Sequence, residues 1–212
     1  MNLWTIIPVK SLHRTKSRLG ALLSSDERAA LTLHLLERTL RLLLALPQVR
    51  ETAVITQDPT VAEIATHFGC RWLADPPDSG LNGAVTEGFA FAGRNGASHC
   101  LILPSDLPFL AGKELAELVN LAETAVHPPT LILCSDQQQQ GTNALIVPTG
   151  NGFRFRYGRN SFQRHQQEAG AQGLSCRLVT LPSIQFDLDT EQDYTFYTQK
   201  RHPISPEKHS AG

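Results

Sequence analysis

Short apolar runs alternate along this chain with longer segments in which leucine and alanine recur on a helical period. The run Cys100–Leu103 is continuous and apolar, which is typical of a strand buried on both faces of a parallel sheet. Residues 25–46 instead carry leucines at helical spacing, beginning at Ser25 and ending before Pro47. Repeated alternation of this kind predicts an α/β protein with a doubly wound, mostly parallel central sheet and helices on both of its faces.

The same pattern predicts the remaining elements. We expect strands over residues 3–9, 52–56, 71–74, 100–103, 130–134, 144–147, 176–181 and 184–188. We expect helices over residues 25–46, 59–67, 81–92, 112–125 and 191–200, and one more beginning near Ser161. No linker or internal repeat interrupts this series, so we predict a single domain over residues 1–201. Residues 202–212 are polar and end in Ala-Gly, which predicts a disordered C-terminal tail.

Composition narrows the classes of partner. The 212 residues include 19 Lys and Arg against 20 Asp and Glu, so the net charge is close to zero and does not favour binding to nucleic acid or an anionic membrane. No segment resembles a membrane span or a signal peptide, and we expect a cytoplasmic protein. The sequence leaves open whether the chain forms a homodimer. Four cysteines lie far apart, in or near apolar runs, which predicts buried thiols rather than zinc ligands or disulfides: Cys70, Cys100, Cys134 and Cys176.

Candidate chemistry begins with Asp106. It follows the strand predicted at 100–103, which Pro104 ends, and open α/β sheets bind ligands outside the carboxyl ends of their strands. Asp106 is therefore placed to hold a metal ion. Asp is also a favoured N-cap residue, and a helical pattern begins a few residues later. Both interpretations remain open from the sequence.

A second acidic group is Asp187-Leu188-Asp189. On a strand, residues two apart point to the same face, so both carboxylates can converge on one ion. Magnesium prefers oxygen ligands and is usually bound by one or two carboxylates together with substrate phosphates. Together with Asp106 the pair provides three carboxylates, enough for one or two ions. The structural alternative is that Asp187 pairs with an arginine and Asp189 caps the last helix.

Basic residues follow the first predicted strand. Lys10, Lys16 and Arg18 could neutralise a triphosphate, with Arg offering a planar fork and Lys a point charge. Neither a G-x-x-x-x-G-K-[ST] run nor G-x-G-x-x-G is present, which argues against a P-loop enzyme and a dinucleotide dehydrogenase. The competing interpretation is that these side chains are merely solvated.

Two further segments carry small polar groups. Gly141-Thr142-Asn143 presents a hydroxyl and an amide just before a predicted strand, and Gly158 and Ser161 precede a predicted helix. A helix N-terminus has free N–H groups and a positive dipole end, so it can bind phosphate or carboxylate. Ser161 could instead be an ordinary N-cap.

Taken together, these motifs resemble one family. The segments W-T-I-I-P-V-K-S-L-x-x-x-K-S-R-L, L-P-S-D-L-P, G-T-N-A-L, Y-G-x-x-S-F-x-R-H and F-D-L-D-T follow one another between Trp4 and about Tyr194. In this order they resemble the guanylyltransferases of coenzyme F-420 biosynthesis, the CofC and FbiD family. Each motif is weak alone, and the combination is specific.

The resemblance implies a nucleotidyltransferase-like, Rossmann-like fold of the GT-A type. It implies an enzyme that joins GMP from GTP to phosphoenolpyruvate, 2-phospho-L-lactate or 3-phosphoglycerate and releases pyrophosphate. It also implies one or two Mg²⁺ ions as cofactor, with the family's metal-binding and catalytic aspartates falling on Asp106, Asp187 and Asp189. By the same likeness the phosphorylated acid contacts Thr142, Gly158 and Ser161, and the nucleotide side comprises Lys10, Lys16, Arg18, Gly80 and Asn82.

Two departures leave the identity of the acid open. Gln137–Gln140 occupies a stretch where relatives are often richer in acidic and glycine residues, and Tyr157 with Arg159-Asn160 replaces the commoner F-G-P-G. Two other functions also remain open. One is a metal-dependent sugar nucleotidyltransferase or glycosyltransferase, although P-V-K-S-L stands where the former usually has a glycine-rich loop. The other is a nucleotide-binding module that does no chemistry.

Overall fold

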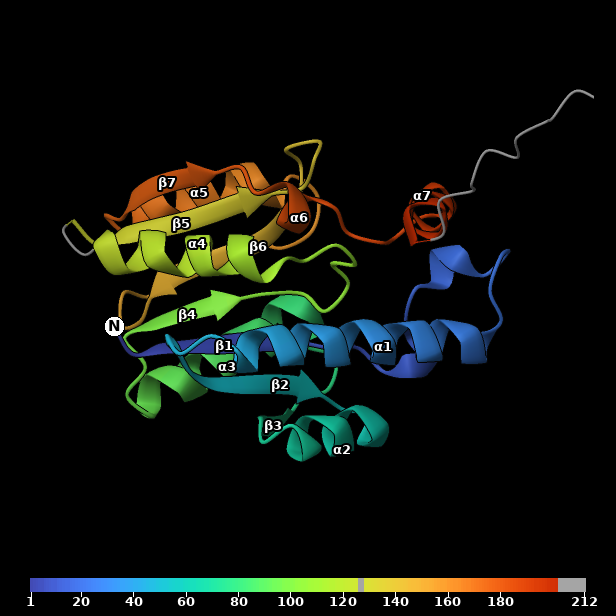
Figure 1. Ribbon diagram of the computed structural model, residues 1–212. Helices are drawn as coiled ribbons and strands as arrows, with labels where there is room; N and C mark the ends of the chain where they lie inside the picture. Colours follow the sequence, from blue (N-terminus) through green and yellow to red (C-terminus); the bar gives the residue numbers. More distant parts are fainter. Residues whose placement is uncertain (126–127, 202–212) are drawn as a thin grey trace, which may run out of the picture.

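The computed structural model describes residues 1–125 and 128–201, and its core is one seven-stranded sheet (Figure 1). The spatial order of the strands is β3-β2-β1-β4-β6-β5-β7. Their bounds are β1 Leu3–Pro8, β2 Val49–Thr56, β3 Arg71–Ala74, β4 His99–Ile102, β5 Thr130–Ser135, β6 Thr142–Pro148 and β7 Ser175–Val179. The order runs outward from β1 in both directions, as in a doubly wound sheet.

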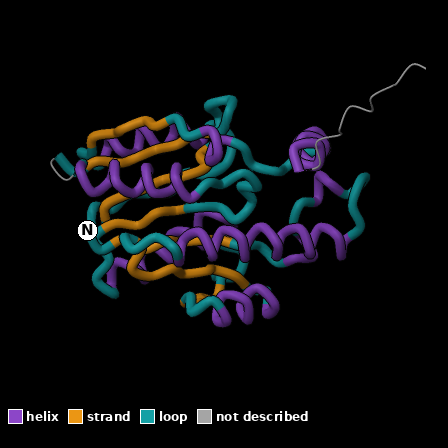
Figure 2. Tube along the Cα trace, viewed as in Figure 1, coloured by secondary structure: helices purple, strands orange, loops and turns teal. Residues whose placement is uncertain are grey.

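Helices connect most of these strands (Figure 2). Their bounds are α1 Ser25–Leu44, α2 Pro59–His67, α3 Gly80–Arg94, α4 Gly112–Thr124, α5 Ser161–Ala171, α6 Pro182–Gln185 and α7 Glu191–Arg201, with short 3-10 helices η1 Leu12–Arg14 and η2 Ser17–Leu19. Local signals set several of the helix starts. Ser24 and Glu27 form a capping box at α1, and Asp58 caps α2 ahead of a proline at its first position.

One strand opposes the rest. β6 pairs antiparallel with both β4 and β5, whereas the other pairings in the sheet are parallel. The amino end of β6 therefore lies at the same edge of the sheet as the carboxyl ends of the other strands. The prediction of a mostly parallel sheet is confirmed, and this reversal brings Thr142 to the edge where ligands bind in such folds.

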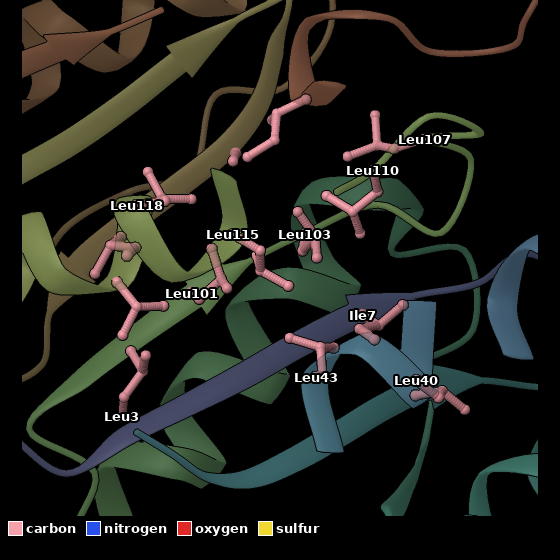
Figure 3. Packing of buried hydrophobic residues seen from close by; sticks show 14 of the residues in the cluster. Leu3, Ile7, Leu40, Leu43, Leu101, Leu103, Leu107, Leu110, Leu115 and Leu118 are labelled. Atoms are coloured by element: carbon pink, nitrogen blue, oxygen red, sulfur yellow. The ribbon is translucent and has the colours of Figure 1, made fainter. Parts of the chain in front are cut away.

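Helices cover both faces of the sheet, as predicted. On one face α1, α2, α4 and α6 pack against the strands, and Figure 3 shows Leu40 and Leu43 of α1 and Leu115 and Leu118 of α4 in this layer. On the other face α3 and α5 cover a second cluster that includes Val85. Burying a leucine side chain contributes roughly 1.5–3 kcal/mol relative to exposing it, so these two layers supply most of the driving force for folding.

A third, smaller cluster lies beyond the carboxyl edge of the sheet. It joins η2 to α7 through Leu19, Leu23, Phe186, Leu188 and Tyr197. Figure 1 shows α7 beside the blue N-terminal segments and away from the main layers. This cluster ties the segment after α6 to the loop after β1.

Three predictions are corrected or left untested. The strand predicted at 184–188 is wrong, because Pro182 begins the short helix α6, which buries Ile184, and the residues after it have no regular structure. Cys70, Cys100 and Cys134 are buried, but Cys176 is exposed because it lies on the edge strand β7. The predicted tail at 202–212 lies outside the described residues. Among the described helices, none has the length and apolar character to cross a bilayer.

Candidate active site

The predicted site residues lie on loops and element ends at the carboxyl edge of the sheet. Asp106 follows β4, and its carbonyl oxygen accepts a hydrogen bond of 3.0 Å from the backbone N–H of Leu188. This bond joins the loop after β4 to the acidic segment Asp187-Leu188-Asp189. The N-cap interpretation of Asp106 is wrong, since α4 begins at Gly112 with Ala111 as its N-cap residue.

Lys16 links both acidic segments to the first loop. Its side chain is only 4% exposed, and its Nζ lies 3.5 Å from Asp106 Oδ2. The same Nζ donates a 2.6 Å hydrogen bond to the carbonyl oxygen of Leu188. The backbone of Lys16 is left-handed, with φ 46°, which is unfavourable for a residue with a side chain and is retained where surrounding contacts hold it. Lys16 thus fixes the loop after β1 against the carboxylates.

Burial and, after it, the charges of Asp106 and Asp189 together raise the pKa of Asp187 to about 6, while a hydrogen bond from Asn143 opposes the shift. The pKa of Asp189 is also raised, first by burial and then by Asp106, against the attraction of Lys16 and Arg18. Arg18 Nη1 lies 4.0 Å from Asp189 Oδ2; the Arg18 side chain is exposed, and that of Asp189 is about half-buried. The structure therefore brings the carboxylates into electrostatic contact with one another and with two cations.

The structural alternatives for the two late aspartates are not observed. Thr190 and Asp193 exchange hydrogen bonds at the start of α7, so Thr190 rather than Asp189 caps this helix. Asp187 makes no ion pair with an arginine among the described residues, and its Oδ1 accepts a hydrogen bond of 3.3 Å from Asn143 Nδ2.

The side chains at this edge determine how well a metal ion would fit. Across residues 1–125 and 128–201, no group of three or more His, Cys, Asp or Glu side chains is arranged to hold a metal ion. Lys16 lies against Asp106 and supplies positive charge there. The pKa values of Asp187 and Asp189 are nevertheless raised, first by burial and then by the charge of Asp106, and a nearby divalent cation would oppose both effects. The donors fit a site that substrate phosphates complete, rather than a closed three-carboxylate centre.

The predicted acid-binding residues form a hydroxyl pair. Ser161 Oγ donates to Thr142 Oγ1 at 3.3 Å, and both side chains are buried. Thr142 Oγ1 also lies 3.0 Å from Nδ1 of the buried His165. The N-cap interpretation of Ser161 is wrong, because Asn160 is the N-cap residue of α5 and Ser161 is its first helical residue.

The amino end of α5 is already partly bonded. The N–H of Ser161 donates to the carbonyl of Gly158, and the N–H of Phe162 donates to the carbonyl of Gln140. Gly158 has φ 110°, a conformation that side chains rarely allow, so a glycine is required in this turn. These two N–H groups are therefore already used. The hydroxyl pair formed by Thr142 of β6 and Ser161 of α5 remains as a polar group at this end of the helix.

Asn82, which the resemblance groups with the nucleotide side, contacts the loop that carries Gly158. Asn82 on α3 accepts a hydrogen bond from the N–H of Tyr157 at 2.7 Å and donates to the carbonyl of Tyr157 at 3.2 Å. Its amide is therefore occupied by the loop that carries Gly158. Gly80 is exposed at the start of α3, where its φ of +62° forms the turn, and Lys10 is exposed directly after β1.

His165 was not singled out in the sequence, and Asn143 was noted only as an amide just before a predicted strand. Asn143 donates to the carbonyl of Ile184 at 3.0 Å as well as to Asp187, and His165 contacts Thr142. Each lies within a quoted motif, G-T-N-A-L and S-F-x-R-H, so a signal was present. No local pattern revealed that two adjacent residues of β6 face different parts of the site. Thr142 contacts Ser161, and Asn143 contacts the acidic segment.

Comparison with known proteins agrees with this geometry. The family model described as "Guanylyl transferase CofC like" matches residues 3–197. The phosphoenolpyruvate guanylyltransferase of Rubrobacter xylanophilus is 37% identical over 193 residues, which cover 91% of this chain and 92% of that protein. The 3-phospho-D-glycerate guanylyltransferase of Phenylobacterium zucineum is 35% identical over 191 residues, covering 89% and 86% of the two chains.

Among solved structures, 4-diphosphocytidyl-2C-methyl-D-erythritol synthase from Anaerococcus prevotii superposes with a TM-score of 0.64 at 10% identity. The match covers 94% of this chain and 96% of that one. At this level of identity the likeness shows the fold alone, which is the nucleotidyltransferase-like fold expected from the sequence.

Proposed function

Because the chain belongs to the CofC-like guanylyltransferase family, we propose that it transfers GMP from GTP to a phosphorylated three-carbon acid and releases pyrophosphate. Relatives named for phosphoenolpyruvate and for 3-phospho-D-glycerate both match, so the proposal covers the class that these acids share. From the resemblance we infer that the reaction belongs to coenzyme F-420 biosynthesis. Both substrates are metabolites of the cell interior, and we infer a cytoplasmic location.

The proposal rests on the side-chain contacts of two adjacent residues at the amino end of β6. Thr142 contacts Ser161 and His165 on one side, and the adjacent Asn143 contacts Asp187 on the other. A phosphorylated acid bound at the hydroxyl pair therefore lies beside the acidic segment. This proximity suits a reaction that joins two phosphorylated molecules, because catalysis of such a reaction depends on holding the reacting groups in line.

No general base is required of the protein. A phosphate monoester has a second pKa of roughly 6 and is largely dianionic at neutral pH, so its oxygen can attack the α-phosphorus of GTP directly. What the chain has to overcome is repulsion between two anions. Lys16, Arg18 and Lys10 lie on the loop after β1 and provide positive charge for the triphosphate.

The acidic residues complete the arrangement. We assign Asp106, Asp187 and Asp189 to Mg²⁺, which when bound would link the carboxylates to the phosphates and neutralise charge that develops in the transition state. Lys16 holds Asp106 and the carbonyl of Leu188, so it orients the acidic segment toward the triphosphate. Thr142, Ser161 and the turn at Gly158 orient the acid. Leaving pyrophosphate departs on the side opposite to the attacking oxygen, as an in-line displacement requires.

Pyrophosphate release tests this proposal directly. The protein is incubated with GTP, Mg²⁺ and, in parallel, phosphoenolpyruvate, 2-phospho-L-lactate and 3-phosphoglycerate, with ATP, CTP and UTP replacing GTP in control reactions. We expect release with GTP and one of the acids, and no release when the acid is omitted. Absence of release with all three acids would refute the proposal and favour a binding module. Release with a sugar phosphate instead would favour a sugar nucleotidyltransferase.

A further inference from the structure

His165 lies fully buried on α5 between two parts of the acid side of the site. Its Nε2 lies 2.9 Å from the backbone nitrogen of Arg156, which donates to it, and its Nδ1 lies 3.0 Å from Thr142 Oγ1. The ring of Tyr157 meets the imidazole edge-on, with ring centroids 4.8 Å apart. The imidazole thus connects the loop before Gly158 to the hydroxyl pair.

These contacts determine where the imidazole carries its proton. A backbone N–H can only donate, so the Nε2 that receives the Arg156 N–H must be the unprotonated nitrogen of the ring. In a neutral imidazole the other nitrogen then carries the proton. Nδ1–H therefore donates to Thr142 Oγ1, and Thr142 acts as an acceptor in this contact.

The direction of that bond decides what the hydroxyl pair can offer a ligand. Thr142 and Ser161 have two hydroxyl protons between them, and their mutual hydrogen bond uses one. If His165 accepted from Thr142, it would use the second, and the pair would have none left. Because His165 donates instead, one hydroxyl proton remains for a further acceptor. This remaining hydroxyl proton can be donated to a ligand that presents an acceptor oxygen, and an anionic group is the strongest such acceptor.

We propose that His165 is a positioning residue whose Nδ1–H orients the Thr142–Ser161 pair as a hydrogen-bond donor to the anionic group of the phosphorylated acid. This inference rests on the function proposed above for the same site. His165 does not touch the reacting atoms, and it acts through Thr142. The backbone of Arg156 sets the tautomer, so the loop that carries Gly158 and the hydroxyl pair are organised by one side chain.

The surroundings keep the imidazole neutral. Burial and, after it, the nearby charge of Arg164 together lower the pKa of His165 to about 4, while Glu168 acts in the opposite direction. Glu168 is itself paired with Arg156, at 3.6 Å between Nε and Oε2. The ring is thus expected to keep one proton, on Nδ1, throughout the physiological range.

The first test reads the tautomer without any substrate. Long-range ¹H–¹⁵N correlation spectra of the full-length protein distinguish the protonated ring nitrogen from the unprotonated one, and comparison with His165→Gln assigns the signal. We expect a neutral ring with its proton on Nδ1 from pH 6 to pH 8. A proton on Nε2, or a ring that becomes charged in this range, would overturn the inference whether or not the protein is a guanylyltransferase.

The second test separates the two nitrogens by kinetics. An Asn side chain places an N–H₂ donor near the position of Nδ1, whereas a Gln side chain places an acceptor near the position of Nε2. We expect His165→Gln to raise KM for the acid about tenfold or more and His165→Asn to raise it less, with KM for GTP changed less than twofold by either. Equal effects on both substrates, or the reverse ranking of the two variants, would indicate a merely structural role.

A double-mutant cycle then tests whether His165 acts through Thr142. With Thr142→Val as background, His165→Gln should add little to the increase in KM for the acid, because the hydroxyl it orients is already absent. Fully independent effects would contradict the inference. If the variants fail to fold, sequential assignment of the wild-type spectra identifies the His165 ring instead, and these spectra still decide the tautomer. A wild type that is inactive with every acid would instead refute the proposed function.

Discussion

Replacing Asp187 by Asn should stabilise the metal-free protein at neutral pH while impairing its activity. The pKa of the Asp187 carboxyl is raised to about 6 by burial and by the charges of Asp106 and Asp189. Since this folded-state pKa lies above the ordinary value of 3.8, the folded protein binds the proton more tightly than the unfolded chain does. The contribution of Asp187 to stability is therefore fully present below pH 3.8 and is lost as the pH rises through about 6.

The magnitude follows from the same shift. A difference of about 2 pKa units corresponds to about 3 kcal/mol of penalty for ionising Asp187 in the folded protein. Because the side chain is half-buried and water screens part of the repulsion, we expect Asp187→Asn to gain about 1 to 3 kcal/mol at pH 8. The Asn oxygen can still accept from Asn143, so the variant removes the charge and keeps the contact. For a chain of this length 1 kcal/mol corresponds to roughly 3 °C in Tm.

Thermal and urea unfolding in EDTA, at pH 5 and pH 8, measure this effect. The stabilisation should be larger at pH 8 than at pH 5, by about 1 kcal/mol, because the wild-type carboxyl is mostly protonated in the folded protein at the lower pH. The exposed Asp78, replaced by Asn, serves as a control that should change little at either pH. A destabilised Asp187→Asn at pH 8, or a gain that does not vary with pH, would refute the electrostatic account of this site.

Three further outcomes are expected. Asp106→Asn should lower kcat for pyrophosphate release more than tenfold, or about 1.4 kcal/mol, and a smaller loss would argue against its metal role. Asn82→Ala should raise KM for the acid about tenfold and change KM for GTP less, because it removes two hydrogen bonds to Tyr157 of roughly 1 kcal/mol each. A larger effect on KM for GTP would indicate that Asn82 acts on the nucleotide side. Lys16→Met should lower stability by about 2 kcal/mol in thermal unfolding, whereas the exposed Lys10→Met should not, and equal stability of the two would contradict the role of Lys16 in joining the loops.

Local sequence determined most of the elements and one edge of the site. Continuous apolar runs predict buried strands, and leucines at helical spacing predict α1 and α4, because burial of one face depends on a period that any window of the chain displays. Asp106 was placed at the carboxyl edge by the same reasoning, since it directly follows such a run. The basic residues after β1 were likewise visible as a cluster within one loop.

Only the tertiary structure decided how these residues meet. The segment Asp187-Leu188-Asp189 is not the strand that its apolar pattern predicted. The backbone N–H of Leu188 bonds the carbonyl of Asp106, 82 positions away, and its carbonyl accepts from the Nζ of Lys16, 172 positions away. The reversal of β6 brings Thr142 to the ligand edge, and strand direction depends on pairing partners rather than on composition. The tautomer of His165 depends on an N–H of the loop before α5, a contact that no hydrophobic period encodes. These meetings depend on how the elements pack, which a local pattern does not specify.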